Sequence, residues 1–319
     1  MTKQNEYDVC VFGSYNIDVV INVPRFPQIG ESLVGSGSYT GIGGKGVNQA
    51  IAASRSGSTV HYIGKIGNDA FSVIAKDYIN NSGIHKVTLL SSLEKPTGKS
   101  LIFVTNDNVA NNMIAVDPGA NFSISKDEVI DVSRSLTSTS FLLMQLENNI
   151  DAIEILIEEA KNNHLKIILN PAPYQFIDDK FLSNIYIITP NETEVELMTG
   201  IKINSFDDAK RAAKELHSKY IENVIITLGE RGVFLSTINS AFHIPPYLSE
   251  AVDTTGAGDA FNGALVSELA RGSSLMEACL FANAYAACAV ERKGAAEAMP
   301  SRAEALNKMK TKSISPITL

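Results

Sequence analysis

Short apolar runs alternate with segments of helical period along most of the chain. Strands are predicted at 7–13, 59–67, 139–147, 165–173, 185–191 and 223–229, a hairpin at 232–246, and helices at 47–57, 69–83, 149–164, 192–200, 205–220, 259–271 and 275–291. Short apolar strands separated by amphipathic helices are typical of a parallel sheet covered on both faces. The pattern therefore predicts an α/β fold, a three-layer α/β/α sandwich with a mostly parallel central sheet.

Two stretches lack the helices of this pattern. They contain strand-like pieces (INVPRF, SLIFVTND, NMIAVD) with no helix between them. We expect them to form a small antiparallel flap over the main sheet. The predicted division is an α/β domain of residues 1–13, 45–96 and 119–319, and a β-sheet flap of residues 14–44 and 97–118.

Composition narrows the class of protein. The 319 residues are 45% hydrophobic and carry a net charge of −8, which argues against a nucleic-acid or anionic-membrane partner. Cys10, Cys279 and Cys288 sit in apolar surroundings without metal-ligand spacing, as buried thiols in a reducing compartment do. The N-terminus lacks the apolar core of a signal peptide, and no apolar run approaches the ~20 residues of a membrane helix. We expect a cytoplasmic protein.

The segment GIGGKGVNQA (41–50) contains a formal G-x-G-x-x-G but does not fit a dinucleotide site. A long segment separates it from the first strand, and the next strand ends near Lys65 rather than an acid. Lys45 is followed by Gly46 rather than Ser or Thr, which excludes a Walker A loop. The remaining interpretation is a glycine-rich loop that leads into a helix. Lys45 and Asn48 in this segment are polar groups that can bind a small polyol.

Asn16 and Asp18 follow the first strand at a spacing of two. In an extended segment both side chains point to one face, where an amide and a carboxylate bind adjacent sugar hydroxyls. The alternative is a turn, which Asn and Asp also favour.

Polar residues end several of the other predicted strands. Glu147 and Asn170 end two of them, Asn191 ends a third, and TLGERG (227–232) follows a fourth. Asn191 and Glu194 lie one helical turn apart and suit Mg²⁺, directly or through water. The same spacing also suits a capping box. Because ligands of open α/β sheets bind beyond the carboxyl ends of the strands, these groups mark a candidate site.

The segment AVDTTGAGDAFNGA (251–264) places small residues before one acid at a helix start. Asp259 alone is a good N-cap. The backbone N–H groups of Gly256, Ala257 and Gly258, however, suit an anion at the positive end of a helix. Asp259 is then a candidate base for a hydroxyl nucleophile in phosphoryl transfer.

These motifs together resemble the PfkB carbohydrate kinase family, from about residue 8 to about residue 300. The matching segments are GSYNID (13–18), GGKGVNQA (43–50), LMQLE (143–147), LNPAP (169–173), PNETE (190–194), TLGERG (227–232), AVDTTGAGDAFNGAL (251–265) and AVERKGA (289–295). The resemblance implies a kinase with ATP as co-substrate and Mg²⁺ as cofactor, a K⁺ activator, and a β-sheet lid that closes over the sugar. It also implies a homodimer through the lid.

The resemblance also implies a role for each site residue. Asp259 is the base, and Gly256, Ala257 and Gly258 form the anion hole. The sugar site comprises Asn16, Asp18, Gly44, Lys45, Gly46, Asn48, Glu147 and Asp259; the nucleotide site comprises Asn191, Thr227, Gly229, Gly232, Gly258 and Asn283. Asn191 and Glu194 serve Mg²⁺, through water, and K⁺ lies at Asp253, Thr255, Ala289, Arg292, Gly294 and Ala298. Position 298 departs from the family pattern, because relatives often carry a small hydroxyl residue there.

The resemblance favours D-ribose, phosphorylated at its 5-hydroxyl. Another sugar or a nucleoside, such as 2-deoxyribose, fructose or adenosine, is the alternative in the same class. A sugar-binding regulator without catalysis is the alternative in a different class.

Overall fold

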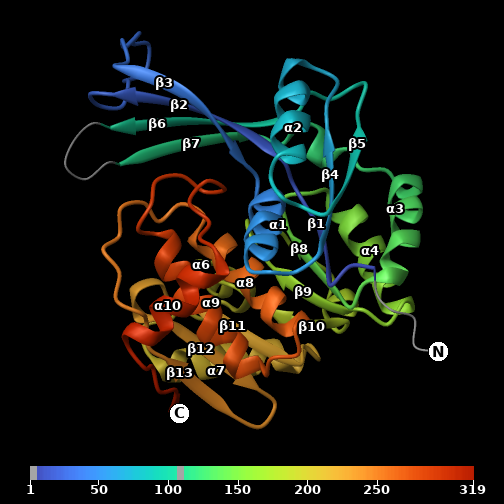
Figure 1. Ribbon diagram of the computed structural model, residues 1–319, viewed down its shortest axis with the longest axis vertical. Coiled ribbons are helices and arrows are strands. Elements are labelled where there is room, and N and C mark those ends of the chain that lie inside the picture. The colour runs from blue at the N-terminus through green and yellow to red at the C-terminus, as the bar shows by residue number, and fades with distance from the viewer. Residues whose placement is uncertain (1–5, 106–110) are drawn as a thin grey trace.

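The computed structural model describes residues 6–105 and 111–319, which form two β-sheets and flanking helices (Figure 1). The strands are β1 Val9–Phe12, β2 Asn16–Val23, β3 Gly37–Gly43, β4 Val60–Ile66, β5 Lys86–Ser91, β6 Gly98–Thr105, β7 Asn112–Asp117, β8 Phe141–Gln145, β9 Lys166–Asn170, β10 Ile185–Ile188, β11 Asn223–Thr227, β12 Val233–Thr237, β13 Ala241–Ile244 and β14 Ile317–Thr318. The helices are α1 Lys45–Arg55, α2 Ala70–Asn80, α3 Lys126–Ser133, α4 Ile150–Asn162, α5 Asp179–Leu182, α6 Glu192–Thr199, α7 Phe206–Ser218, α8 Ala257–Ala270, α9 Leu275–Ala289 and α10 Arg302–Thr311.

The larger sheet has ten strands in the order β14-β13-β12-β11-β10-β9-β8-β1-β4-β5. From β5 to β11 neighbouring strands are parallel, and β12, β13 and β14 add an antiparallel edge. Chain order runs outward in both directions from β1 and β8. Ligands of such sheets bind at this reversal, beyond the carboxyl ends of the strands.

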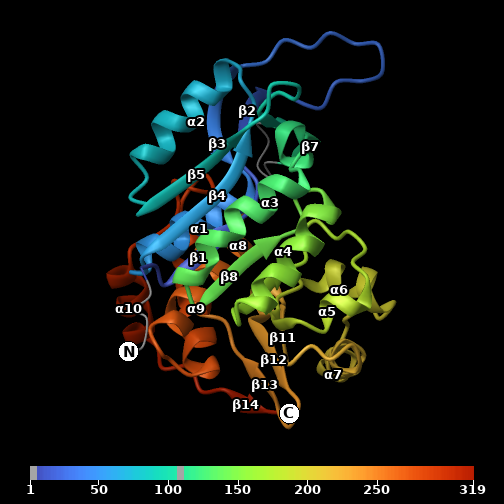
Figure 2. The ribbon, with the colours of Figure 1, turned by 90° about the vertical axis from the view of Figure 1, so that its right-hand side faces the viewer.

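Helices cover both faces of the larger sheet (Figure 2). One core packs α1, α2, α8, α9 and α10, and the other packs α3, α4, α5, α6 and α7. Strand β8 serves both cores, since Phe141 and Leu143 face the first and Leu142 and Met144 the second. The predicted three-layer α/β/α sandwich is confirmed.

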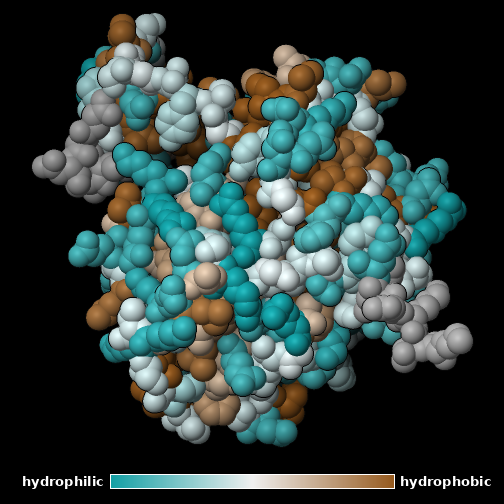
Figure 3. All heavy atoms as spheres, in the orientation of Figure 1, coloured by the Kyte–Doolittle hydropathy of each residue, from teal (hydrophilic) through white to brown (hydrophobic). Residues whose placement is uncertain are grey.

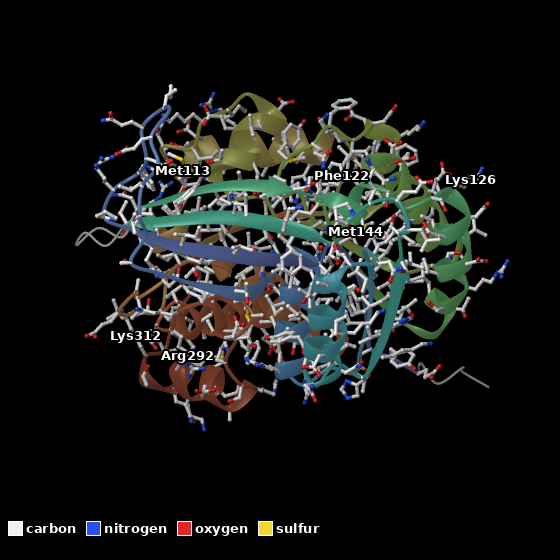
Figure 4. All side chains as sticks on the ribbon, turned by 90° about the horizontal axis from the view of Figure 1, so that it is seen from above. Met113, Phe122, Lys126, Met144, Arg292 and Lys312 are labelled. Atoms are coloured by element: carbon white, nitrogen blue, oxygen red, sulfur yellow. The ribbon has the colours of Figure 1, made fainter. Side chains whose placement is uncertain are left out.

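The smaller sheet has the order β3-β2-β6-β7 and projects from the body (Figures 1 and 4). Its strands lie within 14–44 and 97–118. The outer pairs are antiparallel, but β2 and β6 are parallel. The sheet is therefore mixed rather than wholly antiparallel, because the two hairpins meet through their first strands.

Five of these elements were not predicted from the pattern: β5, α3, α10 and the very short α5 and β14. Strand β5 is a half-buried edge strand, so it lacks a continuous apolar run. Helices α3 and α10 are short and begin with capping boxes, Ser125 with Glu128 and Ser301 with Glu304. The three cysteines are free and buried, as predicted. Within the described residues, no helix has the length and apolar character to cross a membrane.

Candidate active site

The predicted site residues gather where the strands of the larger sheet end. Ser14 follows β1, Glu147 follows β8, Asn170 ends β9, Thr189 follows β10 and Thr227 ends β11. Helices α1 and α8 begin at the same edge and pack against each other. The sheet topology thus brings together segments from both ends of the chain.

Asp259 lies in the first turn of α8 and does not cap that helix. Its side chain turns toward α1, where Oδ2 accepts from Asn48 Nδ2 and Oδ1 accepts from Gln49 Nε2, both at 2.9 Å. The residue is only 5% exposed. The simpler interpretation of Asp259 as an N-cap is therefore wrong, and its carboxylate is held by two amides.

The N-terminus of α8 is bare. Gly256 is the N-cap residue, with φ 74°, and no side chain caps the helix. Ala257 N–H already donates to Thr254 O at 3.2 Å, whereas Gly258 lies where helix N–H groups lack intrahelical partners. A Cβ on Gly258 would meet no atom within 4 Å, so packing does not require this glycine. The open space beside a helix N-terminus fits an anion.

The N-terminus of α1 is formed by a close approach of backbone to backbone. Gly44 has φ 96°, and a Cβ there would lie 2.8 Å from Asn16 N. Glu147 Oε2 accepts from Lys45 N at 2.9 Å and from Ser14 Oγ at 2.5 Å. Gly46 packs against Gly13, which leaves no room for a side chain. Glu147 therefore fixes the start of α1 as well as facing the site.

Lys45 supplies a positive charge among three acids. Burial lowers the pKa of its ammonium, but the charges of Asp259, Glu147 and Glu194 outweigh burial and raise it. Lys45 is therefore a cation at neutral pH, placed to offset negative charge in the site.

Asn16 and Asp18 lie in strand β2 of the smaller sheet, not in a turn. Asn16 Oδ1 accepts from Asn121 Nδ2 at 2.9 Å. Asp18 lies over Gly43, where a Cβ would come within 2.3 Å of the carboxylate. Burial raises the pKa of Asp18 to about 6, despite a hydrogen bond from Ser100. The extended strand gives both side chains a common face.

Asn191 and Glu194 form a capping box at the start of α6. Asn191 Oδ1 accepts from Glu194 N, and Glu194 Oε2 accepts from Asn191 N, both at 2.8 Å. Burial raises the pKa of Glu194, with Lys45 opposing and Asp259 adding to the shift. These oxygens suit a hard cation that keeps several waters. Among the described residues, no three His, Cys, Asp or Glu side chains cluster as a metal site.

Two of the predicted nucleotide residues, Gly232 and Asn283, border the loop after β13. A Cβ on Gly232 would lie 2.2 Å from Ile244 O, and Asn283 Nδ2 donates to Pro245 O at 2.8 Å. Thr227, the last residue of β11, forms an isolated parallel bridge with Asn191, which follows β10. Gly229 has φ 55° with nothing within 4 Å of a Cβ. Thr227 of the predicted nucleotide set thus lies beside Asn191 of the predicted Mg²⁺ pair.

The predicted K⁺ segments also meet. Asp253 Oδ1 accepts from Thr255 N at 2.9 Å and Oδ2 accepts from Gly294 N at 3.0 Å. Asp253 N donates to Val290 O, while Ala289 O accepts from Arg292 N. Ala298 is buried. The Asp253 carboxylate therefore ties the segment before α8 to the segment after α9.

Two hollows lie elsewhere on the molecule. One of about 70 Å³ is lined by residues such as Leu146, Tyr174 and Phe176, and one of about 330 Å³ by Glu158, Lys161 and Phe181. Neither contains a predicted site residue. The predicted site residues instead lie at the carboxyl ends of the larger sheet's strands, at the starts of α1 and α8, and on β2 of the smaller sheet.

Sequence reasoning missed several polar residues that hold the site together: Ser14, Gln49, Asn121, Gln145 and Asn262. All five are buried. Gln145 ends the apolar run FLLMQ, and Gln49 lies on the buried part of α1. A polar side chain within an apolar run was the available signal.

Comparison with known proteins agrees with this geometry. Residues 7–302 match the family described as pfkB family carbohydrate kinase. The chain is 40% identical over 296 residues to a ribokinase of Haemophilus influenzae, spanning 93% of this chain and 96% of that protein. It is 32% identical over 300 residues to a deoxyribokinase of Salmonella typhi, spanning 92% and 96%. The ribokinase of Arabidopsis thaliana complexed with ribose and ATP has a similar structure, with TM-score 0.87, 28% identity and coverage of 95% and 99%.

A fold of this kind, with a carboxylate beside an open helix N-terminus, defines a phosphotransferase that acts on a hydroxyl group. The chain belongs to the pfkB family of carbohydrate kinases.

Proposed function

We propose that this protein is an ATP-dependent ribokinase, which converts D-ribose and ATP into D-ribose 5-phosphate and ADP. The observation that carries the proposal is the position of Asp259. Its carboxylate is held by Asn48 of the glycine-rich segment, and the open N-terminus of α8 lies directly before it. Ribokinases among the relatives support ribose as the acceptor.

In this proposal Asp259 takes the proton of the 5-hydroxyl as the hydroxyl oxygen attacks the γ-phosphorus. The bond from the γ-phosphorus to the bridging oxygen breaks, and ADP leaves. The N–H groups from Gly256 to Gly258 stabilise the charge on the transferred phosphoryl group, with Ala257 N–H shared between that group and Thr254 O. The ammonium of Lys45 adds to this stabilisation.

The sugar lies between the two sheets. Asn16 and Asp18 contact it from β2, while Lys45, Asn48 and Glu147 contact it from the body, with Gly44 and Gly46 allowing close approach. The smaller sheet acts as a lid, and its closure excludes water from the phosphoryl group.

Asn191 and Glu194 would hold Mg²⁺ through water, and the bound ion would neutralise phosphate charge of ATP. Asp253 and Thr255, with backbone groups of Ala289, Arg292, Gly294 and Ala298, would hold K⁺. Thr227, Gly229, Gly232 and Asn283 border the nucleotide.

A second acceptor, 2-deoxyribose, is favoured by one observation, the 32% identity to a deoxyribokinase. One hydroxyl changes affinity only modestly in a permissive pocket. A non-catalytic regulator is disfavoured, because Asp259 and the open glycine are both present.

We also propose a homodimer in which the smaller sheets of two copies pair. Strand β7 is an exposed edge with the apolar side chains Met113, Ile114 and Val116. Figure 4 marks Met113 on this strand, and hydrophobic atoms are visible on the projecting part in Figure 3. Exposed apolar edges of this kind are normally covered. The three buried free cysteines support a cytoplasmic location.

A coupled assay of ADP release tests the proposal. Acceptors are ribose, 2-deoxyribose, fructose, adenosine and none, each with ATP and Mg²⁺ in K⁺ and in Na⁺. We expect release that favours ribose and rises with K⁺. Preference for another acceptor would overturn ribose as the substrate, and release that does not depend on any acceptor would overturn the kinase assignment.

A further inference from the structure

Gln49 is the most completely bonded side chain next to the base. It is 0% exposed, so a substrate does not reach it. Its Nε2 donates to Asp259 Oδ1 at 2.9 Å and to Asn170 Oδ1 at 3.0 Å, and its Oε1 accepts from Gln145 Nε2 at 2.7 Å. Both of its N–H donors and its oxygen are therefore used within the protein.

The neighbours of Gln49 fix the direction in which its amide points. Asn170 Nδ2 donates to Thr189 O at 3.1 Å, and a backbone carbonyl only accepts. The oxygen of Asn170 therefore faces Gln49 and requires a donor there. A reversed Gln49 amide would place oxygen against oxygen at both Asn170 and Asp259.

The same set of side chains reaches the anion site. Thr189 Oγ1 donates to Asn262 Oδ1 at 2.6 Å, and Asn262 Nδ2 donates to Gly258 O at 2.8 Å. Gly258 and Asp259 are adjacent residues, one held through its carbonyl and the other through its carboxylate. One buried chain of hydrogen bonds thus joins the carboxylate of Asp259 to the backbone of Gly258 at the proposed anion site.

We infer that Gln49 is a positioning residue for phosphoryl transfer, which aligns the Asp259 carboxylate through the buried chain Gln145–Gln49–Asn170–Thr189–Asn262. The inference deepens the proposed function and rests on it. Asn48, the second donor to Asp259, is also predicted to contact the sugar. Gln49 makes all of its hydrogen bonds within the protein, so its effect on Asp259 does not depend on bound sugar. A base misplaced by a fraction of an ångström loses much of its effect.

Two variants and a matched control separate positioning from mere stability. Gln49→Met removes the amide and keeps the volume of the side chain. Gln49→Glu keeps the shape and places an acceptor against Asp259. The control is Asn223→Leu, which removes another buried amide, one that donates to Tyr186 O from the amino end of β11.

For Gln49→Met we expect kcat to fall about 10- to 100-fold while KM for ribose stays within about threefold. Gln49→Glu lowers kcat further, because it places an acceptor against both the Asp259 carboxylate and the Asn170 oxygen. Asn223→Leu lowers thermal stability and leaves kcat and KM unchanged.

The inference is overturned if Gln49→Met keeps the kcat of the wild type, if its KM for ribose rises as much as its kcat falls, or if Asn223→Leu lowers kcat equally. If Gln49→Met does not fold, the isosteric Gln49→Glu decides by the same comparison of kcat with KM. The wild-type protein is assayed first: its failure to phosphorylate any acceptor overturns the proposed function itself, whereas an active wild type with unaffected Gln49 variants overturns only the positioning role.

Discussion

Asn48 Nδ2 and Asp259 Oδ2 lie 2.9 Å apart, although 211 positions separate the two residues in the chain. This contact joins the glycine-rich start of α1 to the start of α8. A residue predicted for the sugar therefore touches the residue predicted as the base. We make five predictions from this arrangement and its surroundings, four of them on the site and one on the exposed edge strand β7.

Asp259→Asn removes the base and keeps the shape of the side chain. We expect turnover to fall by about 10²- to 10⁴-fold, with ribose affinity changed by less than about fivefold. Steady-state ADP release and calorimetric titration of ribose measure the two effects. The exposed Asp207→Asn on α7 is the control. Near-normal turnover of Asp259→Asn would show that another group takes the proton.

Gly258→Ala separates stability from function. Because a Cβ at this position meets no atom within 4 Å, we expect unchanged stability or a gain of about 0.5–1 kcal/mol. The methyl group occupies the anion space, so turnover should drop by about 100-fold or more.

Gly263→Ala on the same helix is the contrasting variant. Its Cβ would lie 2.5 Å from Ala52 Cβ, so this variant should lose stability in urea unfolding. If Gly258→Ala keeps full turnover, the space before it is not the phosphate site.

Asp18 makes the free energy of unfolding depend on pH. Burial raises its pKa from the ordinary 3.8 to about 6, so between these values the folded protein retains a proton that the unfolded chain has released. Stability contributed by this group is thus full below about pH 4 and is lost as the pH rises through about 6. We expect Asp18→Asn to gain on the order of 2 kcal/mol relative to the wild type between pH 4 and pH 7. A difference that stays constant with pH in urea titrations would contradict this.

Asp253→Ala removes the carboxylate that ties residue 255 to residue 294. We expect the ratio of activity in K⁺ to activity in Na⁺ to fall to about one. Asp253 is the only negatively charged residue among those predicted for K⁺, so its loss leaves the cation with neutral oxygen ligands alone. Asp207→Ala, on the exposed face of α7, should retain the wild-type ratio. Normal stimulation of Asp253→Ala by K⁺ would place the cation elsewhere.

Ile114→Asp tests the homodimer. Ile114 is 51% exposed on the edge strand β7, and a charge there opposes pairing of two smaller sheets. We expect the wild type to be a dimer and the variant a monomer by light scattering. Val73→Asp, at a 67% exposed position on α2, should remain a dimer. A wild type that is monomeric at all concentrations would exclude the proposed interface.

The central layers of the fold could be predicted because each strand and helix carries its own pattern. Strand β8 is apolar from Phe141 to Met144, and α7 begins with a capping box at Ser205. Strand β5 was not predicted, because a half-buried edge strand does not need a continuous apolar run. The parallel pairing of β2 with β6 could not be predicted from the sequence either, because it depends on how two hairpins pack against each other.

The candidate site was predictable as a set of residues but not as a set of contacts. The sequence marked Asp259 and Asn48, yet the bond from Gln49 depends on two helices that are distant along the chain. Asn191 and Glu194 had two interpretations, and the structure places them in a capping box while leaving them beside Lys45. The local sequence cannot distinguish a capping box from a Mg²⁺ site, because both use the side-chain oxygens of Asn191 and Glu194.

The close packing of α1 on α8 also has a consequence for the order in which the chain is made. The ribosome delivers the glycine-rich segment at 41–50 more than 200 residues before Asp259. A nascent chain that ends between them therefore lacks both the proposed base and the helix N-terminus proposed to bind phosphate. Such a chain already carries groups proposed to contact the sugar, but it cannot transfer a phosphoryl group until α8 has been made and has packed on α1.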